Sequence, residues 1–258
     1  PAGELCIEEL KKIRQIETRL SGRLQQLVHP EEILNVGIGL MHSVAWMPRL
    51  LPLFHEHYPD VSVRLIEQGD ELLLKALQSN DADIIIGGMP VSTEEVTVTL
   101  ALEQLLLIVP RAFNIIPSWA YTGNSYENPY EIDPKQLQGL PLILPSTVND
   151  IGGITNQVLE HFDIRPKFVT TVDSMQTAAM LVAQDMGYLF TSPIFLKAQM
   201  AELAPNIVYC MARGIPDSRK IVAVYHSDTN KEEMISQFLK LVRVVMFKDQ
   251  PGMFPLDG

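Results

Sequence analysis

The sequence has few of the residues that build cross-linked or membrane-spanning proteins. Only two cysteines occur, Cys6 and Cys210, so neither a disulfide framework nor a paired-cysteine metal site is predicted, and a reducing compartment is expected. No stretch approaches the roughly 18 continuous apolar residues of a spanning helix. The first residues also lack the basic and apolar segments of a secretion signal. We therefore expect a cytoplasmic protein that does not enter a membrane.

Basic charge is also scarce. The 258 residues include 20 Lys and Arg against 31 Asp and Glu, which gives a net charge of −11. Residues 1–29 hold five basic and four acidic side chains, so the excess of acid belongs to residues 30–258, with 15 basic against 27 acidic. Because binding to nucleic acid phosphates requires a basic face, this chain by itself is not expected to bind DNA.

The common catalytic motifs are missing as well. The sequence has no G-x-S-x-G, no phosphate-binding P-loop and no H-E-x-x-H. Gly37 and Gly39 follow a predicted strand, but His42 occupies the third glycine position of a dinucleotide-binding fingerprint. We expect no catalytic residues, no metal and no cofactor, and hence no enzyme. The expected ligand is instead a small molecule that is bound without being transformed.

The first 29 residues differ in kind from the rest. Apolar residues recur there at alternating spacings of three and four. One position of this series is polar, Glu17. The apolar positions are Cys6, Leu10, Ile13, Leu20, Leu24 and Leu27. A period near 3.5 is typical of a coiled coil, so we predict a long helix that pairs with a second chain through Leu10, Ile13, Leu20, Leu24 and Leu27. The alternative is an amphipathic helix lying on the core of its own domain.

After Pro30 the pattern alternates between strands and helices, which predicts an α/β fold with mostly parallel sheets. A first series has strands at 33–38, 61–67 and 83–86, with helices at 44–57 and 71–78. A second has strands at 141–144, 167–172 and 188–190, with helices at 154–162 and 175–184; strands at 207–211 and 221–225 and a helix at 231–247 follow. An apolar run at 102–109 and a loop or insertion at 111–134 separate the series. Two series indicate two lobes.

Short polar groups follow several of these strands, where ligands collect in open α/β sheets. They are Met41-His42-Ser43, Gln68-Gly69-Asp70, Gly87-Gly88-Met89, Ser146-Thr147 and Thr191-Ser192-Pro193. Taken singly, Ser43, Ser146, Thr147 and Ser192 are also what a helix N-cap prefers. Taken together, five such edges in two lobes would line one cleft if the lobes face each other.

The ordered motifs resemble the effector-binding region of LysR-type transcriptional regulators. The most specific element is Met47-Pro48-Arg49-Leu50-Leu51-Pro52-Leu53-Phe54 followed by Tyr58-Pro59-Asp60-Val61. Further matches are Pro1 to Glu4, Leu34 to Gly39, Glu67-x-Gly69, Asp83 to Ile86, Leu137-x-Gly139-x-Pro141 and Val182-Ala183-x-x-x-Gly187. The resemblance covers essentially the whole chain.

This resemblance implies two Rossmann-like lobes of the type 2 periplasmic-binding-protein fold, preceded by a linker helix over residues 1–29. The first lobe would take 30–109 and 222–258, and the second 110–221. An effector would bind between them at Met41, His42, Ser43, Asp70, Gly88, Met89, Ser146, Thr147, Thr191, Ser192 and Pro193. The protein would form a homodimer or homotetramer and reach DNA only through an N-terminal winged helix-turn-helix that is absent from this chain.

Two other classes share the implied fold. A solute-binding protein of a transporter would lack the heptad helix and carry a secretory leader. An enzyme on the same scaffold would need a nucleophile or an acid–base set that the sequence does not display. Both alternatives are therefore less favoured than a ligand-gated regulator.

Overall fold

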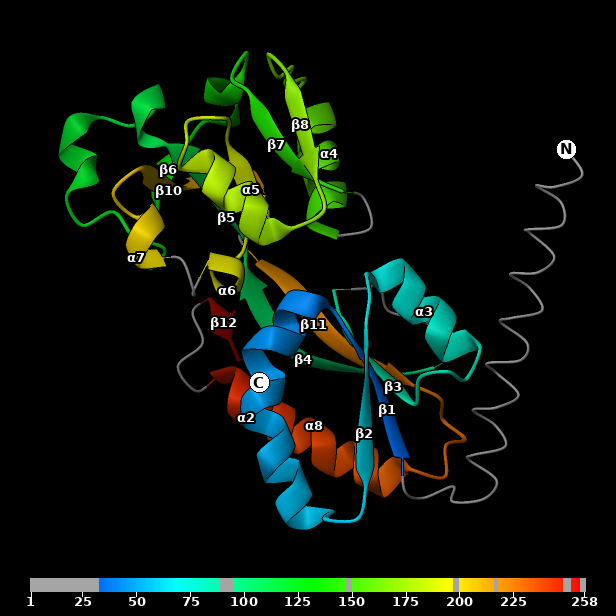
Figure 1. Cartoon of the computed structure of the whole chain (residues 1–258). Helices are drawn as coiled ribbons and strands as arrows, with labels where there is room; N and C mark the ends of the chain where they lie inside the picture. The colour runs from blue at the N-terminus through cyan, green and yellow to red at the C-terminus, as the bar shows by residue number, and fades with distance from the viewer. Residues whose placement is uncertain are drawn as a thin grey trace, which may run out of the picture.

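The computed structural model describes residues 33–88, 95–146, 150–196, 200–215, 218–247 and 252–255. These residues form two sheet-containing lobes, one above the other in Figure 1. The dimerisation residues predicted between Leu10 and Leu27 lie outside them. In this part of the chain, no helix combines the length and the apolar character needed to cross a membrane.

Lobe I is built on a six-stranded sheet in the order β12-β4-β11-β3-β1-β2. Its strands are β1 (Ile33–Ile38), β2 (Ser62–Glu67), β3 (Ile84–Gly87), β4 (Val96–Gln104), β11 (Ser218–Tyr225) and β12 (Met253–Phe254). Strand β1 lies between β2 and β3 and is parallel to both, whereas β11 runs antiparallel to β3 and β4. The carboxyl ends of the three parallel strands therefore meet at one edge.

Helices cover both faces of this sheet. On one face, α2 (Leu40–His57) and α8 (Glu232–Phe247) pack on each other, and α3 (Asp70–Gln78) covers the other. Ile84 and Ile86 join the core on the α2 side, while Ile85 packs with Leu73 and Leu77 of α3. Burial on both faces explains why β3 is a continuous apolar run rather than an alternating one.

Lobe II contains a mixed sheet in the order β6-β10-β5-β9 and a parallel pair, β7-β8. The elements are β5 (Leu106–Pro110), β6 (Tyr130–Ile132), β7 (Leu142–Pro145), α4 (Asp150–His161), β8 (Val169–Val172), α5 (Met175–Val182), β9 (Leu189–Thr191), α6 (Pro193–Leu196), α7 (Met200–Leu203) and β10 (Ile207–Ala212). A single bridge between Leu142 and Tyr188 connects the two sheets. The described parts of α4 and α5 pack against β7 and β9. The two-lobed α/β architecture agrees with the prediction. The sheets are mixed rather than mostly parallel, because β4, β11 and β12 pair antiparallel in lobe I and β5 pairs antiparallel with both β9 and β10 in lobe II.

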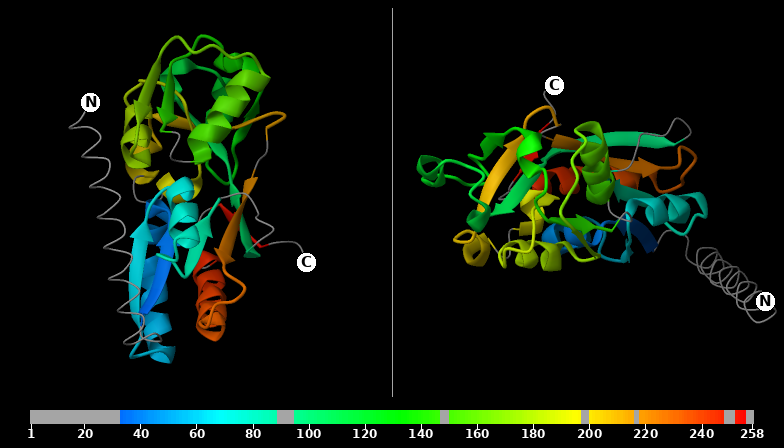
Figure 2. Two further views of the ribbon diagram at one scale, coloured as in Figure 1. Left: turned by 90° about the vertical axis from the view of Figure 1, so that its right-hand side faces the viewer. Right: turned by 90° about the horizontal axis from the view of Figure 1, so that it is seen from above.

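The two crossing segments lie elsewhere than predicted. Strand β4 belongs to the lobe I sheet and β5 to the lobe II sheet, so the first crossing is at Leu105. The return crossing precedes Ser218, because all of β11 pairs within lobe I. The family resemblance implies boundaries at 109/110 and 221/222 instead. Figure 2 shows the crossing seen from the side and from above.

The segment predicted as a loop at 111–134 contains short ordered elements. They are the 3-10 turns η1 (Arg111–Phe113) and η2 (Ser118–Tyr121), followed by β6 and by η3 (Pro134–Leu137). Within it Ile116 is buried, whereas Trp119 is 72% exposed. Asn124 holds the segment through two 2.8 Å hydrogen bonds to the backbone of Tyr209 on β10.

Helix α4 approaches the end of β7 closely because of one glycine. A Cβ added at Gly152 would lie 2.5 Å from the Pro145 oxygen and 2.9 Å from the Ser146 oxygen, while one at Gly153 would meet nothing within 4 Å. We expect Gly152→Ala to destabilise the fold by about 1–3 kcal/mol through overpacking. Gly153→Ala is the matched control and should stabilise by about 0.5–1 kcal/mol.

Urea unfolding of both variants measures these free energies. Equal shifts in the same direction for the two glycines would show that the approach of α4 to Ser146 does not constrain residue 152.

Candidate functional site

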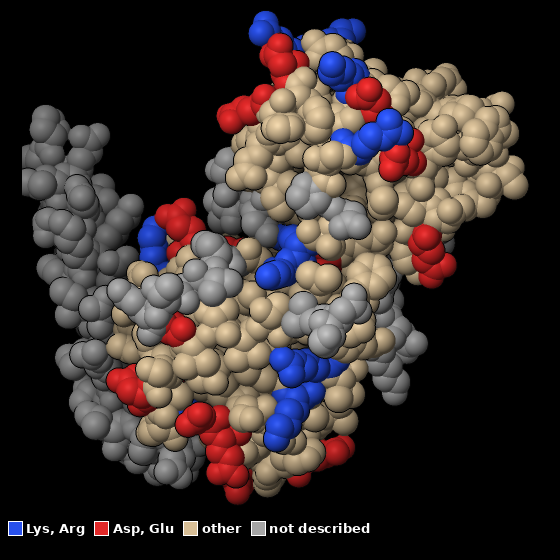
Figure 3. Space-filling model, turned by 180° about the vertical axis from the view of Figure 1, so that it is seen from behind, with Lys and Arg blue, Asp and Glu red and all other residues tan. Residues whose placement is uncertain are grey.

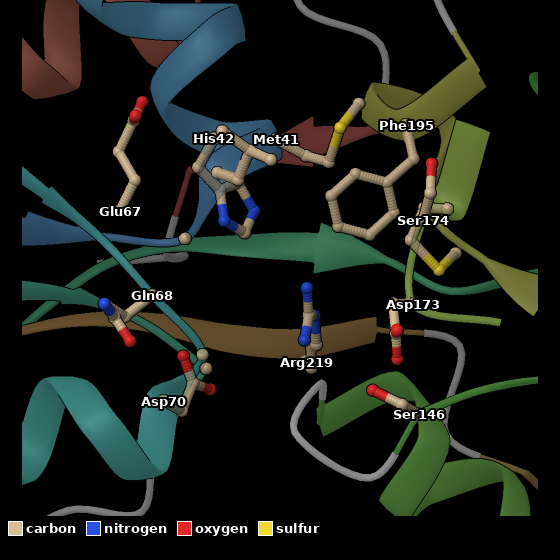
Figure 4. A pocket seen from close by; sticks show the side chains of 15 residues that line it. Met41, His42, Glu67, Gln68, Asp70, Ser146, Asp173, Ser174, Phe195 and Arg219 are labelled. Atoms are coloured by element: carbon tan, nitrogen blue, oxygen red, sulfur yellow. The ribbon is translucent and has the colours of Figure 1, made fainter. Parts of the chain in front are cut away.

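A cavity of about 630 Å³ lies between the two lobes. Lobe I contributes residues that follow β1, β2 and β3, and lobe II contributes residues that follow β7 and β8 (Figure 4). The lining residues are Gly39, Leu40, Met41, His42, Glu67, Gln68, Gly69, Asp70, Gly88, Ser146, Asp173, Ser174, Met175, Phe195 and Arg219. The volume is within the roughly 300–1,000 Å³ typical of small-molecule sites.

Five of the residues predicted to bind ligand line this cavity. They are Met41, His42, Asp70, Gly88 and Ser146. Four others do not line it: Ser43, Thr191, Ser192 and Pro193 are buried in the protein. Met89 and Thr147 lie outside the described residues.

Two local features explain why Ser43 and Ser192 do not reach the cavity: where α2 begins, and a capping hydrogen bond. Helix α2 begins four residues earlier than the sequence suggested, with Gly39 as its N-cap, so Ser43 falls within the helix and faces the core. The Ser192 hydroxyl accepts a 3.4 Å hydrogen bond from the Ile194 N–H, which is a capping contact. The capping explanation therefore describes Ser192, and it does not describe Ser43.

A buried charge cluster lies at the back of the cavity. Glu103, at the end of β4, is 0% exposed. Its Oε1 is 3.0 Å from Nε2 of His42, and its Oε2 accepts a 2.6 Å hydrogen bond from Nε of Arg219 on β11. Since Glu103 and Arg219 are partners across the β4–β11 ladder beside the crossing segments, this cluster links both crossings to the cavity wall.

The two carboxylates of this region have opposite pKa shifts. Burial alone would raise the pKa of Glu103, but the charges and hydrogen bonds of Arg219 and His42 outweigh it and lower the pKa to about 2. At Asp70, burial dominates and raises the pKa, although Arg219, His42 and the N–H of Gly88 oppose it. Glu103 is thus a permanent anion, whereas Asp70 is a less strongly stabilised one.

Aromatic rings complete the wall beside His42. The imidazole stacks on Trp46 with ring centroids 4.6 Å apart, and the Phe195 ring of α6 lies 5.6 Å away. Trp46 is 0% exposed, while the chain's other tryptophan, Trp119, is on the surface. Trp46 is therefore a natural fluorescent reporter of events at His42.

Sequence reasoning missed Arg219, Glu103 and the lobe II residues Asp173, Ser174 and Phe195. One signal was present: Glu103 interrupts a run of apolar residues, and a carboxylate in a buried strand needs a charged partner. Arg219 gave no such signal, because it lies next to Lys220 in an ordinary polar stretch.

Known proteins with related sequences are transcriptional regulators. The chain is 24% identical over 180 residues to the RuBisCO operon transcriptional regulator of Acidithiobacillus ferrooxidans, covering 70% of this chain and 54% of the relative. It is 21% identical over 188 residues to the HTH-type transcriptional regulator YybE of Bacillus subtilis (strain 168), covering 72% and 60%. The chain thus spans little more than half the length of these relatives.

Solved structures show the same fold. The regulatory domain of Synechocystis PCC6803 CcmR, in complex with 2-PG, matches with a TM-score of 0.69 and 16% identity, over 84% of this chain and 99% of that one. A family comparison matches residues 29–246 to the LysR substrate binding domain. Since this match covers most of the chain, the protein belongs to the LysR substrate-binding domain family.

Proposed function

We propose that this chain is the effector-sensing part of a LysR-type transcriptional regulator and is not an enzyme. The observation that carries the proposal is the cavity of about 630 Å³ whose wall is shared between two lobes joined by two crossing strands. A ligand there contacts both lobes at once. It therefore favours the relative lobe position in which its contacts are best, which is the differential affinity that switching requires.

The charge cluster supports this mechanism. His42 lies in the first turn of α2, Glu103 is next to the last residue of β4 and Arg219 is the second residue of β11, so a ligand that touches His42 or Arg219 acts on the strands at the crossing. The regulator would pass the change to a DNA-binding part and would act as a homodimer or homotetramer. The proposed pairing through Leu10 to Leu27 concerns residues outside the described part of the chain.

The lobe-to-lobe site can be tested with a tyrosine that fills it. In a background with Trp119→Phe, Trp46 is the only tryptophan, so fluorescence excited selectively at tryptophan reports on it alone. Ligands from a metabolite panel that raise the melting temperature should also change Trp46 emission, and Ser146→Tyr should abolish both responses by occupying the cavity. Ser118→Tyr, on the exposed η2 turn outside the cavity, is the control and should leave both unchanged.

Binding that survives Ser146→Tyr, or that never alters Trp46, would place the ligand elsewhere. For the regulatory role, the full-length regulator should give a different operator footprint with and without the bound compound. An unchanged footprint with every bound compound would contradict the switching mechanism.

A further inference from the structure

The described wall of the cavity carries more negative than positive charge. Its ionisable side chains are the carboxylates of Glu67, Asp70 and Asp173, the guanidinium of Arg219 and the imidazole of His42. Arg219 is bound to the buried Glu103, so its charge is largely balanced within the protein. A simple anionic ligand would therefore meet more carboxylates than cationic groups along the described wall.

Among these carboxylates, Asp70 has an oxygen that lacks a hydrogen-bond donor in the described part of the chain. It lies at the start of α3 and accepts a hydrogen bond from the Gly88 N–H. Its Oδ2 atom is buried, and no described residue donates to it. Burying a carboxylate oxygen without a donor costs free energy, because the oxygen loses its hydrogen bonds to water and no protein group replaces them.

Residues of both lobes surround Asp70 with a second carboxylate, an aromatic ring and apolar side chains. Figure 4 shows Arg219 between Asp70 of lobe I and Asp173 of lobe II, with the ring of Phe195 on the same wall as His42. Aromatic faces attract cations and also pack against alkyl chains. Met41 and Met175 add flexible apolar surface to the cavity.

We propose that the effector carries a positively charged hydrogen-bond donor, a protonated amine or an amidine, which binds the carboxylate of Asp70. This inference rests on the proposed function, since it assumes that the effector occupies the lobe-to-lobe cavity. An ammonium or amidinium group supplies both a hydrogen-bond donor and a further positive charge, whereas a hydroxyl supplies only the donor and a carboxylate supplies neither.

Three sets of probes test the proposal on the chain as it is. They are the proteinogenic amino acids with linear diamines, the linear mono- and dicarboxylates of two to six carbons, and uncharged monosaccharides. Thermal shift identifies binders, and isothermal titration gives their dissociation constants. We expect binders only among the amine-bearing probes, and N-acetylation of the tightest one should weaken its binding to the unmodified protein at least tenfold.

Asp70→Asn provides the matching change in the protein. The asparagine carbonyl can still accept from Gly88, but the negative charge is lost, so the affinity for the amine-bearing probe should fall at least tenfold. Glu71→Gln is the control, because Glu71 is the next residue of α3, is exposed, pairs with Lys75 at 2.6 Å and does not line the cavity. The affinity of the Glu71→Gln variant for the amine-bearing probe should equal that of the unmodified chain.

The outcomes separate the two proposals. Carboxylates or monosaccharides that bind in the cavity while amines do not would overturn the cationic effector and leave the sensing function intact. Equal affinity of the amine and its acetylated form would also overturn it, even if Asp70→Asn failed to fold. The absence of any binder in all three sets would count against both proposals.

Discussion

Replacing Glu103 with glutamine is expected to destabilise the protein by about 3–5 kcal/mol. Glu103 is 0% exposed and is bound to both Arg219 and His42. Glutamine preserves the shape but removes the charge, and the Arg219 guanidinium, whose side chain is only 9% exposed, then loses its ion pair with Glu103. Urea unfolding near neutral pH measures the loss.

Two variants make this result specific to the buried cluster. Glu131→Gln removes a carboxylate that pairs with Arg213 on the surface, where both side chains are more than half exposed, and its unfolding midpoint should not change. Adding Arg219→Met to Glu103→Gln should recover a large part of the stability, since the buried guanidinium that lost the Glu103 carboxylate is removed as well. A Glu103→Gln variant as stable as Glu131→Gln would contradict the assigned role.

The same residue should make the fold sensitive to acid. The pKa of Glu103 is about 2 in the folded chain against an ordinary value of 4.5, so its contribution is complete above about pH 4.5 and is lost as the pH falls toward 2. The Glu103→Gln variant has no carboxylate at position 103 that could be protonated. The difference in unfolding free energy between the two proteins should therefore narrow as the pH is lowered, and a constant difference would argue against the buried anion.

The second large effect is expected at the opposite end of the lobe I sheet. Asp83 Oδ2 accepts hydrogen bonds from Nζ of Lys231 at 2.8 Å and from the backbone and side-chain nitrogens of Asn35. Lys231 is 6% exposed and also donates to the Ile33 oxygen at 2.7 Å. This group ties the starts of β1, β3 and α8 together.

Asp83→Asn should cost about 3 kcal/mol, because it leaves the Lys231 ammonium buried without an anion. Asp81→Asn is the control: Asp81 is exposed and its carboxylate accepts a hydrogen bond from the Ser79 hydroxyl, so urea unfolding should show little change. Asp83 precedes β3, whereas the cavity follows it at Gly88, so ligand affinity should be unaltered in both variants. Weakened binding in Asp83→Asn would show that the two ends of the sheet are coupled.

The comparison of these two clusters shows why their residues were not found from the sequence. Asp83 and Lys231 are 148 positions apart, and Glu103 and Arg219 are 116 apart. Single charges in a sequence usually indicate exposed surface. Their burial and pairing follow from strand order, because β11 returns from lobe II to lie between β3 and β4.

The exposed surface agrees with the sequence in a more general way. The face seen in Figure 3 carries acidic and basic side chains interspersed with uncharged surface over both lobes. That distribution fits the net charge of −11, which argued against DNA binding by this chain itself.

The sequence by itself determined the class of fold, the existence of two lobes and the strand ends where polar groups gather. Those features depend on local periodicity and on the rule that parallel strands present their carboxyl ends at one edge, so Met41, His42, Asp70, Gly88 and Ser146 could be predicted as cavity residues. Only the tertiary structure decided which polar side chains face the space between the lobes. That outcome depends on where α2 begins, on the crossing at Leu105 and on the long-range pairing of Glu103 with Arg219, none of which leaves a local pattern.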